Sequence, residues 1–191
     1  QFEQSGAGLW TSGAIGRAIF LSGLKVEQGV LVHARLVRAQ EALVTEGDLH
    51  LVSLLTPTQS SCGFGDNDRS WRQLMAMWRR LGAVERGAAS RMGVDADLLA
   101  GRSAGWIGSG SAPLEPYHQL WRALLLRRLS CDAPLEAVAK EFHCQLGDVQ
   151  RLQTDALTSA CQVRTFCEEM GWLSLASLVR DYKERLDFGG G

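Results

Sequence analysis

No run of 18 apolar residues occurs anywhere in the sequence, so we expect no membrane-spanning helix. The first four residues, QFEQ, lack both the basic and the apolar stretch of a secretion signal. They also lack an initiator methionine, and we therefore expect a fragment cut from a longer protein. Its 191 residues, 46% of them hydrophobic, are enough for one sizeable domain or two small ones.

The sequence has no excess of charge of either sign, because 20 basic residues face 21 acidic ones and the net charge is -1. A DNA-binding domain that acts alone usually shows a basic excess or a basic stripe. Any contact with nucleic acid is therefore expected to be local, or to lie beside a partner that supplies phosphate contacts.

Paired cysteine motifs are missing. The five cysteines are odd in number and include no CxxC pair, which argues against a disulfide framework and against a zinc site. This pattern fits a reducing, intracellular compartment, in which we expect the thiols to be structural. The cysteines are Cys62, Cys131, Cys144, Cys161 and Cys167.

Signatures of catalysis are absent as well. The glycine-rich stretches at 101–110 and 189–191 match neither GxGxxG nor GxxxxGKS/T, so no phosphate-binding loop is expected. The sequence contains no Ser/His/Asp arrangement, no HExxH motif and no DExH-like box. The chain alone is thus expected to catalyse no reaction and to bind no cofactor or metal.

Helical periodicity is what the sequence does contain. Apolar residues recur at helical spacing over most of the chain, and almost nothing alternates with period two. We therefore expect an all-α fold, a multi-helix bundle. The short apolar run 49–55 is compatible with a helix or a strand. Helices are expected over residues 26–46, 71–81, 84–92, 95–100, 117–130, 135–142, 147–170 and 174–186.

Glycine-rich breaks suggest four parts. Residues 1–24 look irregular and are interpreted as the end of a preceding unit and a linker. A first helical subunit is expected over 25–104, a glycine-rich loop over 105–113, and a second helical subunit over 114–188.

The second subunit contains a helix-turn-helix-like pair, in which the helix expected over 135–142 leads through a short turn into the one over 147–170. Such pairs occur in DNA-reading domains and also in bundles that never contact DNA, so the pattern leaves DNA reading open. Residues of the first helix are expected to pack against Val149 and Leu152. They are Leu135, Val138, Ala139 and Phe142.

The helix expected over 147–170 is long and has two different faces. At ~1.5 Å a residue it forms a rod of roughly 36 Å. Its apolar face consists of Val149, Leu152, Ala156, Val163, Phe166, Cys167 and Met170.

The opposite, polar stripe of this helix holds only two charged residues, and these have opposite signs. Its hydroxyl and amide groups suit contacts with sugar, phosphate and base edges. Cross-linking of neighbouring helices is the alternative role, and the pattern does not decide between the two. The stripe consists of Arg151, Thr154, Asp155, Thr158, Gln162 and Thr165.

Most of the tryptophans are expected in the core. Four of the six lie at helical spacing or at a helix end, which favours packing over base stacking. His50, inside an apolar run, is interpreted in the same way as a core residue. The four tryptophans are Trp71, Trp78, Trp121 and Trp172.

Five blocks of the sequence, in order, resemble the helicase-like domain of DNA polymerase theta and the related polymerase-theta-like DNA helicases. Together they run from Thr11 to Gly189, nearly the whole chain. Any one block is weak evidence, whereas five in the family's order are fairly specific. The blocks are TSGAIGRA at 11–18, LHLVSLLTP at 49–57, GDVQRLQ at 147–153, FCEEMGW at 166–172 and RLDFG at 185–189.

The resemblance implies a nuclear, Ski2-like superfamily 2 helicase that unwinds DNA from 3′ to 5′ with ATP and acts in repair. In that family, RecA-like motor domains and a winged helix precede this region, and ATP and Mg belong to the motors. The helical region closes a ring around the translocating single strand of DNA. This chain lacks the motor motifs, and whether a polymerase follows it is open.

The resemblance also assigns a role to the helix over 147–170, which matches the family's ratchet helix along single-stranded DNA. In archaeal relatives an arginine and, seven residues later, a tryptophan contact the DNA. These positions fall on Arg151 and Thr158, so the arginine is kept and the aromatic ring is replaced. Ser53 is a further departure, since relatives tend to carry an aromatic residue there.

We therefore expect a helical module that guides single-stranded DNA, working with the motor and winged-helix domains of its parent. One alternative is a scaffold that binds proteins through the face carrying Trp71 and Trp78. Another is a helix-turn-helix protein that reads duplex DNA, although the near-neutral charge counts against it.

Overall fold

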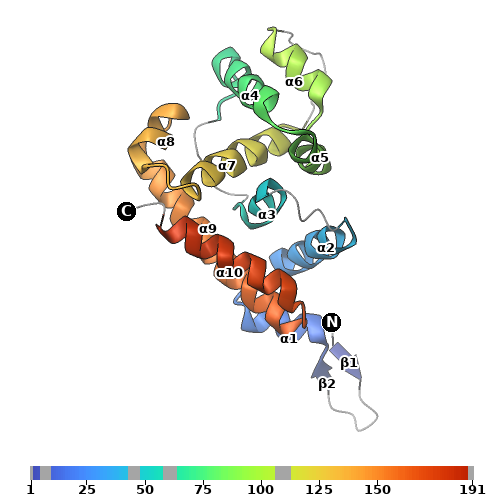
Figure 1. Ribbon diagram of the computed structural model, residues 1–191. Helices are drawn as coiled ribbons and strands as arrows, with labels where there is room; N and C mark the ends of the chain where they lie inside the picture. Colours follow the sequence, from blue (N-terminus) through green and yellow to red (C-terminus); the bar gives the residue numbers. More distant parts are fainter. Residues whose placement is uncertain (1, 5–9, 43–47, 58–63, 106–112, 189–191) are drawn as a thin grey trace.

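The computed structural model describes residues 2–4, 10–42, 48–57, 64–105 and 113–188 (Figure 1). This part of the chain folds into ten helices and one small antiparallel ribbon of two three-residue strands, so the predicted all-α class is confirmed. The elements are β1 (Phe2–Gln4), β2 (Trp10–Ser12), α1 (Ala14–Leu21), α2 (Val26–Ala42), α3 (Asp48–Leu55), α4 (Asp68–Arg80), α5 (Ala83–Arg91), α6 (Ala96–Ser103), α7 (Glu115–Leu129), α8 (Leu135–Glu141), α9 (Leu146–Glu169) and α10 (Leu173–Phe188).

The amino-terminal segment differs from the irregular linker expected over 1–24, because it contains the ribbon and helix α1. A helix of eight residues is too short to be stable alone. Helix α1 packs against α9, and Ala18 and Ile19 are buried there. Contacts with a segment more than a hundred residues away therefore stabilise a helix that the local sequence does not indicate.

Helix α9 lies at the centre of the packing. It contacts α1, α3, α7, α8 and α10, and Figure 1 shows α10 running back along it. Gly171 permits this reversal, because its φ of 74° lies in the left-handed region that favours glycine. Six of the seven residues predicted for the apolar face of α9 are buried, and Met170 is half-buried.

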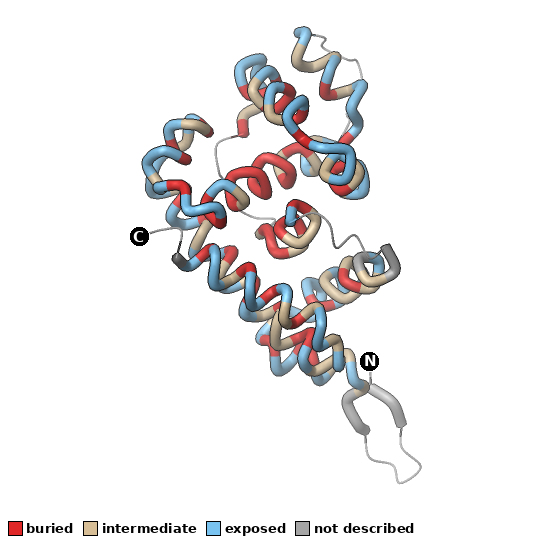
Figure 2. Tube along the Cα trace, in the orientation of Figure 1, coloured by how far each residue is buried: buried red, intermediate tan, exposed pale blue. Residues whose placement is uncertain are grey.

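The most buried helix is α7, which Figure 2 shows in red along most of its length. Trp121 is 1% exposed and meets Phe142 of the α8 end edge to face at 5.2 Å. Trp71 of α4 meets Tyr117 of α7 in the same way at 5.0 Å. The predicted core packing is confirmed for Trp71, Trp78 and Trp121, while Trp172 is half-buried.

Helices α8 and α9 form the predicted helix-turn-helix-like pair. Val138 and Phe142 of the first helix segment are buried in the same core as Val149 and Leu152 of the second. His143 in the intervening turn has a φ of 52°, which reverses the chain between the helices.

The proposed division at a glycine-rich loop over 105–113 stays a prediction, since 106–112 lie outside the described residues. Helices from both expected subunits pack together, most closely α3 with α7. No helix in the described ranges is long and apolar enough to span a membrane.

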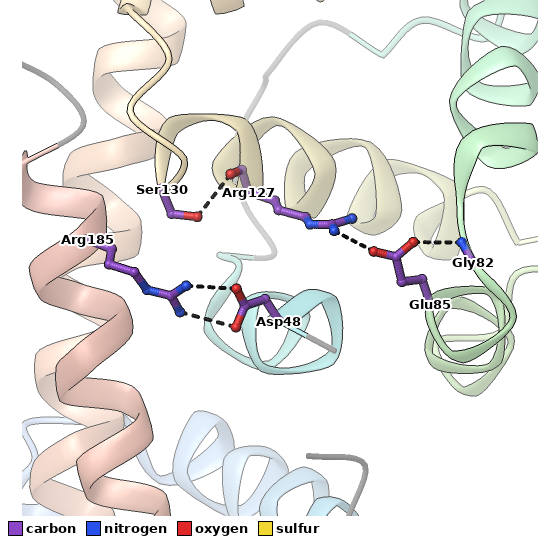
Figure 3. Close-up of polar contacts among 6 residues, drawn as sticks. All are labelled: Asp48, Gly82, Glu85, Arg127, Ser130 and Arg185. Carbon is purple, nitrogen blue, oxygen red and sulfur yellow. Dashed lines mark hydrogen bonds and ion pairs between the residues drawn. The ribbon is translucent and has the colours of Figure 1, made fainter. Parts of the chain in front are cut away.

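Ion pairs fix the orientation of α3 and α5 (Figure 3). Arg185 of α10 donates two hydrogen bonds to Asp48 at the start of α3, at 2.7 and 3.2 Å, and these lower the pKa of that carboxyl group. Arg127 of α7 pairs with Glu85 of α5, which also accepts a hydrogen bond from the Gly82 N–H at 2.8 Å. Residues of both α3 and α5 line one cavity of the molecule.

Candidate nucleic-acid interface

The polar stripe of α9 lies on the side that the neighbouring helices leave uncovered. Four of its six residues are exposed, and the last two are half-buried. The exposed residues are Arg151, Thr154, Asp155 and Thr158, and the half-buried ones are Gln162 and Thr165.

Arg151 presents an unengaged guanidinium group. It is exposed, and the described part of the chain offers it no ion pair or hydrogen bond. Arg185, by contrast, is paired with Asp48. Because a guanidinium carries five N–H donors in a planar fork, Arg151 can receive a phosphate or a base edge without breaking an internal contact.

The two threonines use their hydroxyl protons within the helix. Thr154 donates to the carbonyl of Gln150 and Thr158 to the carbonyl of Thr154, each at 3.0 Å. In this arrangement each hydroxyl oxygen can still accept a hydrogen bond. The amino group of a base can therefore donate to this oxygen directly. A phosphate, which only accepts hydrogen bonds, can be bound only if the hydroxyl group rotates away from the carbonyl.

Gln162 links two parts of the fold. Its side-chain amide donates to the carbonyl of Gly23 at 3.3 Å and thereby links α9 to the turn between α1 and α2. Cross-linking of helices, the alternative interpretation of the stripe, is thus realised at this one residue.

A cleft of about 210 Å³ opens beside the stripe, and we call it the α9 cleft. Its α9 wall includes Asp155, Thr158 and Gln162, together with Ser159, which the sequence interpretation missed. Arg151, Thr154 and Thr165 do not line it. The facing wall is formed mainly by α2 and the end of α3, and it includes Leu31, Val32, Arg35, Leu54, Thr56 and Pro57.

A second cavity of about 310 Å³ lies among α2, α3, α5 and α7, and we call it the arginine pocket. It shares Arg35 and Leu54 with the α9 cleft. Three of its lining residues are arginines, and none of the described lining residues is acidic. The pocket is lined by Arg35, Arg38, His50, Ser53, Leu54, Arg91, Met92 and Gln119.

Burial affects two ionisable groups in this pocket. Desolvation lowers the pKa of Arg35, and the negative charge of Glu115 partly offsets this lowering. An arginine nevertheless remains protonated near neutral pH. The pKa of His50 is also lowered, mainly by desolvation and to a smaller extent by the positive charge of Arg91. His50 is half-buried and lines a cavity, and so the interpretation as a core histidine needs correction.

No local pattern in the sequence indicates the arginine pocket. Arg35 and Arg38 lie on a helix with an ordinary amphipathic pattern, and Arg91 lies more than fifty residues away at the end of another. Only the packing of α2, α3 and α5 brings them together, and this cannot be inferred from local spacing.

Among the described residues, the cysteines and acidic groups form no candidate metal site. No group of three or more histidine, cysteine or acidic side chains suited to a metal ion occurs in the described ranges. Burial raises the pKa of the Cys167 thiol to about 12, which fits a structural role. Cys131 and Cys161 are exposed, contrary to the expectation that all the thiols are structural, and Cys62 lies outside the described residues.

The rings of Trp71 and Trp78 do not form an exposed protein-binding face. Trp71 is 2% exposed and Trp78 is 8% exposed, because both rings are packed into the core. The alternative of a scaffold that binds partners through this face is therefore wrong.

A family model described as the "DNA_pol_Q helicase like region helical domain" matches residues 27–186 of the chain. The sequence is 28% identical over 187 residues to DNA polymerase theta of Drosophila melanogaster, covering 98% of this chain and 9% of that protein. It is 26% identical over 179 residues to DNA polymerase theta of Mus musculus, covering 92% of this chain and 7% of that protein.

Similarity extends to a second kind of relative. The chain is 25% identical over 169 residues to Helicase POLQ-like of Homo sapiens, covering 86% of this chain and 15% of that protein. The chain thus spans less than a fifth of the length of the curated relatives it matches.

Proposed function

Because the chain belongs to the family of helical domains from the helicase-like region of DNA polymerase theta, we propose that it guides single-stranded DNA within an ATP-dependent DNA helicase. The strand lies along the exposed flank of α9 and enters the α9 cleft. ATP and Mg act in the RecA-like motor domains of the parent, and the chain itself performs no catalytic step. We further propose that the parent works in DNA repair in the nucleus.

The observation that supports this proposal most directly is the exposed polar flank of α9. One flank of that helix is buried against several helices, while the other is exposed and carries an arginine, Arg151, with no internal partner among the described residues. Arg185, in contrast, forms an ion pair with Asp48. Polar groups without fixed base partners suit sequence-neutral contacts with a moving strand.

The exposed apolar residues of α1 and α2 suit a contact with another domain of the parent. Phe20 is 82% exposed and Val26 is 65% exposed, and Val30, one helical turn after Val26, is exposed as well. Large apolar side chains gathered on one surface usually mark an interface. We propose that a motor or winged-helix domain covers them.

The proposal is tested by replacing Arg151 with alanine in the parent helicase and in the 191-residue chain. In the parent, Arg151→Ala is expected to uncouple ATP hydrolysis from unwinding, because the motor would advance without a firm hold on the strand. In the chain, affinity for a fluorescent single-stranded oligonucleotide is expected to fall. Unchanged unwinding together with unchanged single-strand affinity would refute the role of α9.

Arg72→Ala is the matched control. Arg72 is an exposed arginine of α4, a helix that lines neither the α9 cleft nor the arginine pocket. The Arg72→Ala substitution removes one positive charge, as Arg151→Ala does, but should leave unwinding intact. Anisotropy titrations over a range of salt concentrations compare single-stranded with duplex oligonucleotides, because phosphate contacts depend strongly on salt. A duplex preference would favour helix-turn-helix reading instead.

A further inference from the structure

The arginine pocket adjoins the α9 cleft, and helices α2 and α3 contribute to both cavities. Arg35 and Leu54 line both. These two residues therefore lie at the boundary between the α9 cleft and the arginine pocket. The cleft beside α9 thus borders a positively charged cavity that no described α9 residue lines.

Positive charge is concentrated in the arginine pocket. Arg35 and Arg38 come from α2 and Arg91 from the end of α5, and no carboxylate is among the described lining residues. Glu115 acts on Arg35 through its charge, but it forms an ion pair with Arg122 and does not line the pocket. The pocket thus carries three positive charges in a chain whose net charge is -1.

The polar wall of the pocket is held in place by internal hydrogen bonds. Gln119, buried on α7, donates to the carbonyl of Ser53 at 3.0 Å. Ser53 in turn donates to the carbonyl of His50 at 2.7 Å. These bonds fix the α3 side of the pocket before any ligand arrives.

A planar guanidinium group can donate two parallel N–H hydrogen bonds to the oxygens of one phosphate. A cluster of arginines therefore suits a phosphate group better than an apolar ligand. Arg38 and Arg91 are exposed, and Arg35 is half-buried at the junction with the α9 cleft. This arrangement leaves the pocket accessible and favours a phosphate that belongs to a longer chain over a small, enclosed anion.

We propose that the arginine pocket binds a backbone phosphate of the single strand where the strand leaves the α9 cleft. The inference rests on the proposed function, because it extends the strand path from α9 across α2 and α3. It assigns Arg38 and Arg91 to phosphate binding, with Arg35 at the junction between the two cavities.

The test compares two double variants of the full chain. Arg38→Gln/Arg91→Gln removes two charges from the pocket, whereas Arg72→Gln/Arg79→Gln removes two exposed charges from α4. Circular dichroism melting curves establish that both variants fold. Affinity for a fluorescent single-stranded oligonucleotide is then measured between 50 and 200 mM salt, a range over which phosphate contacts respond strongly.

The pocket variant is expected to bind the strand about tenfold more weakly, as follows from losing a hydrogen bond to a charged group. The plot of log affinity against log salt should become shallower by about 0.7, the value for one phosphate contact to a single strand. The α4 variant should keep the original slope. The variant Arg38→Lys/Arg91→Lys preserves both positive charges and should therefore show the slope of the unaltered chain.

A second measurement separates a strand phosphate from free phosphate. Inorganic phosphate is added at matched ionic strength, and the melting temperature is compared with that in chloride. If phosphate raised the melting temperature only of chains with an intact pocket, while strand affinity were the same for both double variants, the pocket would hold a free anion and the inference would be overturned.

The inference and the proposed function fail in different ways. If the unaltered chain binds the strand and Arg151→Ala weakens binding, but the pocket variant matches the α4 variant, only the inference is refuted. If the unaltered chain binds no strand, both are refuted.

Discussion

Glycine at position 29 is required for the close packing of α1 against α2, and alanine there should destabilise the protein. A Cβ added at Gly29 would lie 2.4 Å from Cγ1, 2.7 Å from Cδ1 and 3.0 Å from Cγ2 of Ile19. Ile19 is buried, and its branched side chain is stiff at χ1, so it cannot turn away easily. Relief therefore requires α1 and α2 to separate, and α2 forms much of the wall of the α9 cleft that faces α9.

The magnitude follows from two opposing terms. Overpacking a buried contact costs about 1–3 kcal/mol, while replacing glycine by alanine in a helix gains up to ~1 kcal/mol. With three atoms of one stiff side chain within 3.0 Å, the cost should lie in the upper part of its range. We expect Gly29→Ala to lower the free energy of unfolding by about 1–2 kcal/mol, as a net value.

Gly87→Ala in α5 is the matched control, because a Cβ at this position meets no atom within 4 Å. It should raise the free energy of unfolding by roughly 0.5–1 kcal/mol. Urea denaturation followed by circular dichroism measures both variants. An equal gain in stability for Gly29→Ala and Gly87→Ala would refute the close packing of α1 on α2, and with it the position of α2 beside α9.

Three further predictions concern the interface and its support. Asp155→Asn should strengthen binding of single-stranded DNA in anisotropy titrations, because it removes a carboxylate that repels phosphate from the α9 cleft; weaker binding would instead indicate that the carboxylate accepts hydrogen bonds from bases. The hydrogen bonds from Arg185 lower the pKa of Asp48. At pH values above the usual carboxyl pKa of 3.8, the Asp48–Arg185 pair should therefore stabilise the fold by about 0.2–1 kcal/mol. This contribution should be lost as the pH falls through the lowered pKa of Asp48. In urea titrations, Arg185→Gln should remove that part of the pH dependence, and an unchanged profile would contradict the pairing. Leu152→Ala should cost about 2–5 kcal/mol in the same assay, since Leu152 is fully buried on the apolar face of α9, and a loss below 1 kcal/mol would contradict that burial.

Helices with a regular apolar period were predictable from the sequence. The helix expected over 147–170 is observed as Leu146–Glu169, because its pattern of buried residues extends over several turns. The short run at 49–55 could not be assigned, since a few apolar residues fit a helix or a strand equally well. Helix α1 was missed because its stability depends on α9, far away in the sequence.

The candidate site was predictable only where one helix carries it. The stripe on α9 follows from helical spacing, and its exposure agrees with that spacing for Arg151 and Thr158. Arg35 and Arg91 belong to separate helices that meet through tertiary packing, so no local pattern indicates the arginine pocket. The link from Gln162 to Gly23 was likewise outside the reach of sequence spacing.

Photo-crosslinking measures most directly whether a strand lies along the exposed flank of α9. A benzophenone amino acid replaces Thr158 in one variant and Arg72, on α4, in another, and each is irradiated with a labelled single-stranded oligonucleotide. We predict covalent adducts from position 158 and essentially none from position 72. Adducts of equal yield from both positions, or none from position 158 under conditions in which the strand is bound, would contradict the account.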